Sequence, residues 1–378
     1  MALLPSYFVV QVAFAPLPPP FSTALAEIEV DASVEGAAAF RLHFDLSRTL
    51  LGDFDALAID IFRPLVPIRI SVSAGLGVAH TLINGYVRDA RVNVANEPGR
   101  STLEVSGMDA LGTLMGHVQV PMIWPNLPDS EVARAIFARY AVAPTFVFPT
   151  PPTRTMVDTT TTQHDKDDAY LQQLARRNAY EVFIQPDPVV GIDQGHFHPP
   201  MTFAPPQGVL SIDFGSQTNL ASFNLDYQML QPTAIVGVAT EPKSRLPVPV
   251  FGVMGREPPM GLEPSLLRIL PPPIETMDVS DAANPAEAMF SAVSRATETS
   301  RAIRASGEVD GLKFNRPLLP GLPVLVRGAG RAHSGLYYVV SVSHRIIKSG
   351  YTQSFQALRN AVGLTGMEIF VDPLAAVA

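Results

Sequence analysis

The pair of residues in this chain that most suggests chemistry is His196 and His198, which flank Phe197. Alternate side chains of an extended strand point to the same face, so two imidazoles at this spacing could form one edge of a metal site. A complete site needs further ligands, and no third ligand near this pair has a recognisable spacing. We therefore interpret both as packed structural histidines and predict no bound metal.

A second polar cluster combines His164 with Asp165, Asp167 and Asp168. A histidine beside carboxylates could perform acid–base chemistry. An amphipathic segment follows immediately, however, and acidic residues are favoured in the first turn of a helix. We therefore interpret this cluster as the start of a helix. The sequence also lacks a Gly-x-Ser-x-Gly motif, a phosphate loop and a dinucleotide fingerprint, so we predict no catalytic residues, no cofactor and no enzyme activity.

The composition favours a β-rich protein with a partly covered surface. The chain has 378 residues, of which 36 are proline and 26 glycine, and this favours short strands and turns over long helices. Only 16% of the residues are charged, so we expect partner proteins to cover much of the exterior. The net charge of −8 provides no basic field for nucleic acid. The absence of cysteine excludes disulfides and fits a reducing compartment.

No segment approaches the ~20 consecutive apolar residues of a membrane-spanning helix. Residues 7–14 are apolar, but they are too few and lack a positively charged flank, so an opening strand is the better interpretation. We predict no direct membrane insertion.

The elements that would position these residues fall into distinct regions. Residues 1–125 read as a first antiparallel β-barrel, because segments such as 39–46 alternate apolar and polar side chains. Trp124, the only tryptophan, lies between Pro121 and Pro125 and is either a core residue or an interface anchor. Residues 126–204 read as an inserted α/β domain with two helices, and residues 205–230 are expected to complete the first barrel.

Residues 231–365 are predicted to form a second β-barrel. It would include a proline-rich loop at 242–273 and a helix from about 285 to 306. Asn284 and Pro285 supply a cap and a first-turn proline for that helix, and Gly307 is its expected end. Residues 366–378 would be a C-terminal tail. The fold class is thus mainly β with an α+β insertion: two antiparallel β-barrels, an inserted α/β domain and a helical insertion.

The strand around residues 336–342 is apolar on both faces, which is unusual for an exposed antiparallel sheet. One face, with Val339, is expected to pack in the barrel core. The other is expected to be covered by a neighbouring subunit or another partner protein. The interface candidates are therefore Trp124, Tyr338, Val340 and Val342.

Residues 320–359 carry an ordered set of turn and strand residues: Pro320, Gly321, Gly335, Tyr337, Tyr338, Val339, Val342, His344, Gly350, Tyr351, Thr352, Phe355 and Arg359. In order and spacing this set resembles the C-terminal barrel of the phage late control D family. Gly85, Gly107 and Asp109 occupy the places of that family's first barrel. Residues 168–183 resemble its helix–strand signature, with Ala179 where glycine is common. These proteins are baseplate hubs of contractile tails, related to the hub part of type VI secretion spike proteins.

The resemblance implies a structural hub whose two barrels are like those of tube proteins. It would be a homotrimer that forms a pseudo-sixfold ring, joins the tail tube protein to a spike protein and contacts other baseplate subunits. A neighbouring subunit, the tube or the spike would then cover the second face of residues 336–342. Such a protein would be assembled in the bacterial cytoplasm into a phage tail or an injection-system particle. The sequence does not distinguish between these two particles. Because the chain stops soon after Arg359, the spike is expected to be a separate polypeptide. The alternative is a tail-associated cell-wall hydrolase or carbohydrate-binding component.

Overall fold

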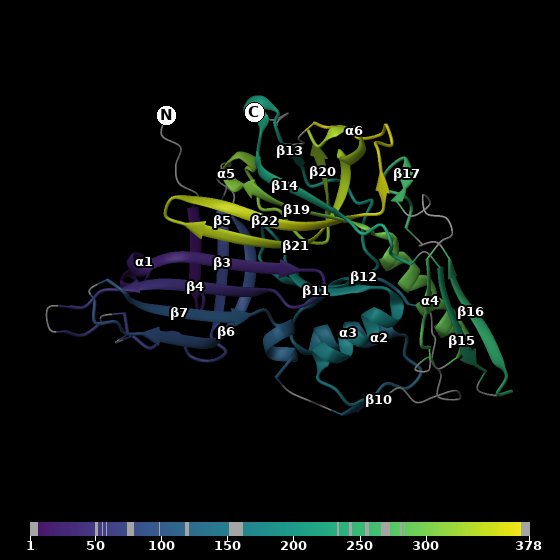
Figure 1. Cartoon of the computed structure of the whole chain (residues 1–378). Helices are drawn as coiled ribbons and strands as arrows, with labels where there is room; N and C mark the ends of the chain where they lie inside the picture. Colours follow the sequence, from purple (N-terminus) through teal and green to yellow (C-terminus); the bar gives the residue numbers. More distant parts are fainter. Residues whose placement is uncertain are drawn as a thin grey trace.

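The protein is mainly β, as the sequence predicts, and most of its strands belong to one large sheet (Figure 1). The computed structural model describes residues 7–49, 52–54, 56–57, 59–73, 79–97, 99–117, 121–150, 162–232, 234–241, 244–253, 257–265, 273–279, 282 and 284–371. Parts of the predicted proline-rich loop and of the C-terminal tail lie outside these ranges.

The N-terminal part of the sheet consists of six main strands, which we call the N-terminal unit. They are β1 (Tyr7–Val12), β3 (Leu25–Ser33), β4 (Ala39–Leu46), β5 (Pro67–Ser73), β6 (His80–Asn93) and β7 (Ser101–Met108). The short strand β2 (Ala15–Pro16) pairs with β1, and helix α1 (Pro19–Ala24) precedes β3. Apolar side chains alternate along these strands, and the inward set, such as Phe40, Leu42 and Phe44 of β4, forms one core.

The C-terminal part of the sheet has six matching strands, which we call the C-terminal unit. They are β13 (Val209–Ser211), β14 (Leu220–Tyr227), β19 (Ile303–Asp310), β20 (Pro323–Arg327), β21 (Gly335–Ile347) and β22 (Gly350–Arg359). Its short elements are η2 (Gly215–Gln217), α5 (Gly311–Phe314), α6 (Gly330–His333) and β23 (Ala361–Val362), which pairs with β17 (Glu263–Pro264).

The two units have the same strand order. In space the N-terminal unit runs β1-β5-β6-β7-β4-β3, and the C-terminal unit runs β13-β20-β21-β22-β19-β14. Taken in chain order, each strand of one unit thus has a counterpart in the other. The one difference in direction is that β13 pairs with β20 in parallel, whereas β1 pairs with β5 antiparallel. The units are hydrogen-bonded into a single sheet because β21 pairs with β3.

This arrangement corrects the expected place of residues 205–230. They were assigned to the first barrel from sequence, but β14 pairs with β19 and β13 pairs with β20, both in the C-terminal unit. Strand pairing depends on residues distant in the chain, and sequence order alone does not reveal it. The α/β insertion therefore lies between the two units.

The insertion packs two helices, α2 (Asp129–Arg139) and α3 (Asp167–Asn178), with a three-stranded sheet. The sheet strands are β9 (Ala143–Val147), β11 (Glu181–Pro186) and β12 (Asp193–His198). The single-turn π-helix η1 (Leu111–Met115) precedes it, and β8 (Met122–Ile123) pairs with β10 (Thr162–Gln163).

A second insertion separates β14 from β19. It contains β15 (Ala234–Thr240), β16 (Pro247–Val253), β18 (Ile274–Thr276), which pairs with β15, and helix α4 (Pro285–Ser300). In Figure 1, β15, β16 and α4 lie together at the right. Asn284 caps α4 by accepting a hydrogen bond from the Glu287 backbone, as predicted. The helix ends at Ser300, not near residue 306, because β19 pairs with both β14 and β22. Gly307, the expected stop, lies inside β19.

Candidate functional site

Trp124 belongs to the core of the α/β insertion. Its side chain is buried, and its Nε1 donates a hydrogen bond to Oε1 of Gln163 at 3.0 Å. Of the two interpretations that the sequence leaves open, this placement favours the core residue.

Tyr338 and Val340 lie on the face of β21 that we expected a partner to cover. The chain itself covers it, with a cluster formed by Val34, Phe183, Met260, Tyr338 and Val340. Phe183 comes from β11 of the α/β insertion. Both faces of the strand are therefore apolar because one packs in the core of the C-terminal unit and the other against the insertion.

A cluster of polar side chains, Tyr338, Glu181, Arg301 and Glu257, lies beside this apolar contact. The Tyr338 hydroxyl donates a hydrogen bond to Glu181, and the Arg301 guanidinium lies 5.8 Å from the Tyr338 ring centroid. Arg301 also pairs with Glu257, with Nε 2.9 Å from Oε2. Burial raises the pKa of Glu181 to about 7, although Arg301 and the Tyr338 hydrogen bond oppose the shift. The group joins β21 and β11 to two parts of the second insertion: Glu257, between β16 and β18, and Arg301, directly after α4.

Val342 does not share a face with Val340, because a bulge interrupts β21. The pairing of β21 with β22 shifts between Val339 and Ser341, so Val342 joins Val339 in the core of the C-terminal unit. All four interface candidates are thus buried within the chain, and exposed surfaces for a partner lie elsewhere.

His196 and His198 are brought together in the α/β insertion. His196 Nδ1 lies 3.0 Å from His198 Nε2, and the His196 ring stacks between Phe146 and Phe183, at 4.5 and 4.3 Å between ring centroids. Burial lowers the pKa of His196 to about 3 and also lowers that of His198. Within the described ranges, no group of three His, Cys, Asp or Glu side chains could hold a metal ion.

The acidic start of α3 is tied into a hydrogen-bonded network. Asp167 is buried and accepts hydrogen bonds from Arg139, Tyr140 and Gln163, at 2.7, 2.8 and 2.5 Å. The pKa of Tyr140 rises to about 12, mainly through desolvation and then through its bond to Asp167. This cluster joins α2, β10 and α3, which is a structural task.

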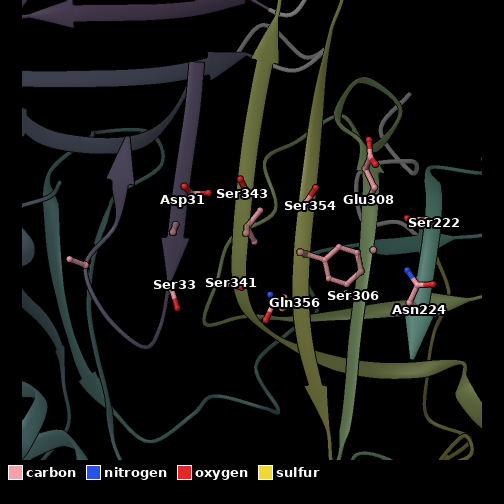
Figure 2. A pocket seen from close by; sticks show the side chains of 15 residues that line it. Asp31, Ser33, Ser222, Asn224, Ser306, Glu308, Ser341, Ser343, Ser354 and Gln356 are labelled. Carbon is pink, nitrogen blue, oxygen red and sulfur yellow. The ribbon is translucent and has the colours of Figure 1, made fainter. Parts of the chain in front are cut away.

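The large sheet presents a continuous polar face. Figure 2 shows its part over β3, β21, β22, β19 and β14, where a hollow of about 530 Å³ is lined mainly by small polar side chains. The labelled residues are Asp31, Ser33, Ser222, Asn224, Ser306, Glu308, Ser341, Ser343, Ser354 and Gln356. Charged pairs continue the face across strands: Arg345 pairs with Glu27, and Arg41 Nη1 lies 2.6 Å from Glu29.

Two of the longest strands of this sheet each have an edge that no strand pairs with in the described parts of the chain. One is the outer edge of β14, which pairs only with β19. The other is the C-terminal half of β6, residues 88–93, which pairs with β7 on one side. Val92 and, just beyond the strand, Val94 are 46% and 54% exposed there. Exposed edges with apolar side chains favour pairing with another strand.

The two units agree in register as well as in strand order. A bulge interrupts the β3–β4 pairing between Leu25 and Glu27, and another interrupts β14–β19 between Leu220 and Ser222. The equivalent long strands also share a bulge, after Val87 in β6 and after Val339 in β21.

A turn before β5 recurs before β20. The backbone N–H of Leu65 donates to Val87 at 2.8 Å, and that of Gly321 donates to Val339 at 2.9 Å. Leu65 and Gly321 both have positive φ, at 65° and 81°. The units are therefore structural repeats, strand by strand.

The sequence analysis predicts two barrels but does not match their strands to one another, although signals for this correspondence are present. Residues 25–31 read LAEIEVD and residues 220–226 read LASFNLD; residues 64–68 read PLVPI and residues 320–324 read PGLPV. Comparing these segments would have paired β3 with β14 and β5 with β20.

The fold as a whole, with its two β-sheet units and its α/β insertion, is similar to solved structures of tail proteins. The tail protein of prophage MuSo2 from Shewanella oneidensis matches 94% of this chain and 99% of its own, with a TM-score of 0.67 and 12% identity. A tail protein from Neisseria meningitidis matches 94% and 97%, with a TM-score of 0.65 and 12% identity.

An E. coli component of the type VI secretion system, described as structurally similar to T4 bacteriophage tail proteins, shares the fold as well. It matches 93% of this chain and 76% of its own, with a TM-score of 0.56 and 12% identity. No family model and no curated protein matches the sequence. In the described ranges, no helix is both long and apolar enough to span a membrane.

Proposed function

We propose that this protein is the structural baseplate hub of a contractile phage tail or a phage-like contractile injection system, and that it belongs to the late control D family. It acts as a trimer whose ring joins the tail tube to a spike and contacts other baseplate subunits. The fold shared with tail proteins over nearly the whole chain supports this proposal, as do the sequence patterns of residues 320–359.

The duplication is the main observation that supports a ring-shaped trimer. Each chain holds two equivalent units in one continuous sheet, so three chains supply six equivalent units. A ring of six similar units matches the sixfold symmetry expected of a tail tube. The continuous polar face would then line the ring, because the opposite face is occupied by the apolar cores.

The test is the copy number and position of the chain in the assembled particle. Native mass measurement of the purified protein and reconstruction of the particle should show three copies between the tube and the spike. Six copies, or a single copy at the particle's periphery, would refute the hub.

The alternative, a tail-associated hydrolase or carbohydrate-binding component, predicts a different result. The purified chain would then cleave or bind peptidoglycan or a surface polysaccharide. The hub predicts that it pulls down the tube protein instead, with no such activity.

A further inference from the structure

The internal contact between the two units is a template for a contact between copies. In this contact β21 runs antiparallel to β3, pairing Ser343 with Asp31 and His344 with Val30. Each strand of this contact has a counterpart with an open edge in the described parts of the chain: β6, in which residues 88–93 pair only with β7, corresponds to β21, and β14 corresponds to β3. Each chain therefore carries, on its free edges, the same two surfaces that it joins internally.

Burial supports this equivalence. In the internal contact Val30 and Ile346 are 0% and 1% exposed. Their counterparts on the free edges are more exposed: Leu225 is half-buried, and Val94 is 54% exposed. These apolar side chains sit at positions that are covered when a neighbouring strand is present.

We propose that successive copies of this chain join by pairing residues 89–95 of one copy with β14 of the next, in the register of the β21–β3 contact. Since both bulges coincide between the units, the register transfers residue by residue. Arg91 then lies opposite Asp226, because their counterparts are Ser343 and Asp31. The remaining pairs are Asp89 with Gln228, Ala90 with Tyr227, Val92 with Leu225, Asn93 with Asn224, Val94 with Phe223 and Ala95 with Ser222.

The chemistry of these pairs is complementary, although the register was taken only from the backbone. Opposite charges meet at Arg91 and Asp226, and two valines meet Leu225 and Phe223. Cross-strand pairs of these kinds stabilise antiparallel sheets. The contact is head-to-tail, so it joins copies in one direction and closes into a ring when the rotation permits. The occupant of both edges is a second copy of this chain.

The first test is a disulfide cross-link, for which the chain is suited because it contains no cysteine. The variant Asn93→Cys/Asn224→Cys should form covalent oligomers under mild oxidation, since directly opposite Cβ atoms lie close enough for a disulfide. The matched control Asn93→Cys/Ser222→Cys shifts one cysteine by two residues on the same face and should cross-link at least about tenfold less, because diagonal pairs are too far apart.

The second test is a charge reversal. Arg91→Glu and Asp226→Arg each place like charges opposite one another across the contact and should weaken association by about fivefold or more. Within the chain Arg91 also lies opposite Glu104, and Asp226 lies opposite Arg304, so urea unfolding of each variant checks that the fold is retained. The double variant Arg91→Glu/Asp226→Arg should restore association. Equal association in all four proteins would contradict the proposed register.

This inference rests on the proposed ring, but the two fail in different ways. Trimers that lack the 93–224 cross-link, both in concentrated protein and in assembled particles, would overturn the strand pairing and leave the hub intact. Cross-linked oligomers that never associate with a tail tube would leave the pairing intact and overturn the hub.

Discussion

Arg359 is fully buried and holds three segments together through their backbone carbonyls. Its guanidinium donates to Ser334 at 3.1 Å, to Gly363 at 2.6 Å and to Met260 at 3.4 Å. It also lies 5.1 Å from the Tyr337 ring centroid. The resemblance to late control D proteins includes this arginine, and its role here is to satisfy buried acceptors.

We predict that Arg359→Met lowers the free energy of unfolding by about 2–4 kcal/mol, because buried carbonyls lose their donors. Urea unfolding followed by circular dichroism measures this. The exposed Arg345→Met, which removes the pairing with Glu27, serves as the control and should change stability little. Equal effects of both substitutions would contradict the structural role of Arg359.

Glu181 should make stability depend on pH. In the folded chain the Glu181 carboxyl keeps its proton up to about pH 7, because its pKa is raised to about 7, whereas an ordinary glutamate loses its proton near pH 4.5. The folded state therefore binds more protons between these values, and the free energy of unfolding falls as pH rises through this window.

Replacing Glu181 by Gln should remove this dependence. Relative to wild type, Glu181→Gln should gain on the order of 2 kcal/mol between pH 4.5 and 7.5, as measured by urea unfolding at several pH values. The exposed-face control Glu27→Gln should run parallel to wild type over the same range. A Glu181→Gln curve that also runs parallel to wild type would show that the carboxyl titrates normally.

At the scale of elements, the end of α3 carries a strained residue. Ala179 has φ of 53°, in the left-handed region, where the resembling family commonly has glycine. Its backbone N–H donates hydrogen bonds to the carbonyls of Ala175 and Arg176, which hold the residue in this conformation. The departure from glycine therefore has an energetic cost.

Ala179→Gly should raise the free energy of unfolding by about 0.5–1 kcal/mol, since glycine adopts positive φ without a steric penalty. The control Ala169→Gly, at an exposed position inside α3, should lower it by a similar amount. Thermal unfolding of both variants decides the point, and a loss of stability in Ala179→Gly would contradict it.

At the scale of the whole molecule, the free edges should respond to assembly. Backbone amides of residues 88–93 and of the outer edge of β14 should exchange rapidly with deuterium in dilute protein, because no strand covers them. In the assembled ring the same amides should become protected, while the internal β21–β3 contact stays protected in both states. Mass spectrometry of exchanged peptides measures this, and unchanged exchange at both edges would argue against strand pairing.

The sequence by itself determined the local features of this protein. Alternation predicted strands such as β4, Asn284 predicted the start of α4, and the turn residues within 320–359 indicated the tail-protein fold. These features depend on interactions between residues close in the chain, and such patterns can be read directly.

Only the tertiary structure decided which distant segments meet. It placed β14 beside β19, ended α4 at Ser300, and covered Tyr338 with Phe183 of the α/β insertion. An apolar strand face has the same sequence pattern whether its cover is the same chain or another protein. The candidate assembly surface therefore emerged only when strand order and register exposed two equivalent units, each with one edge joined and one edge free.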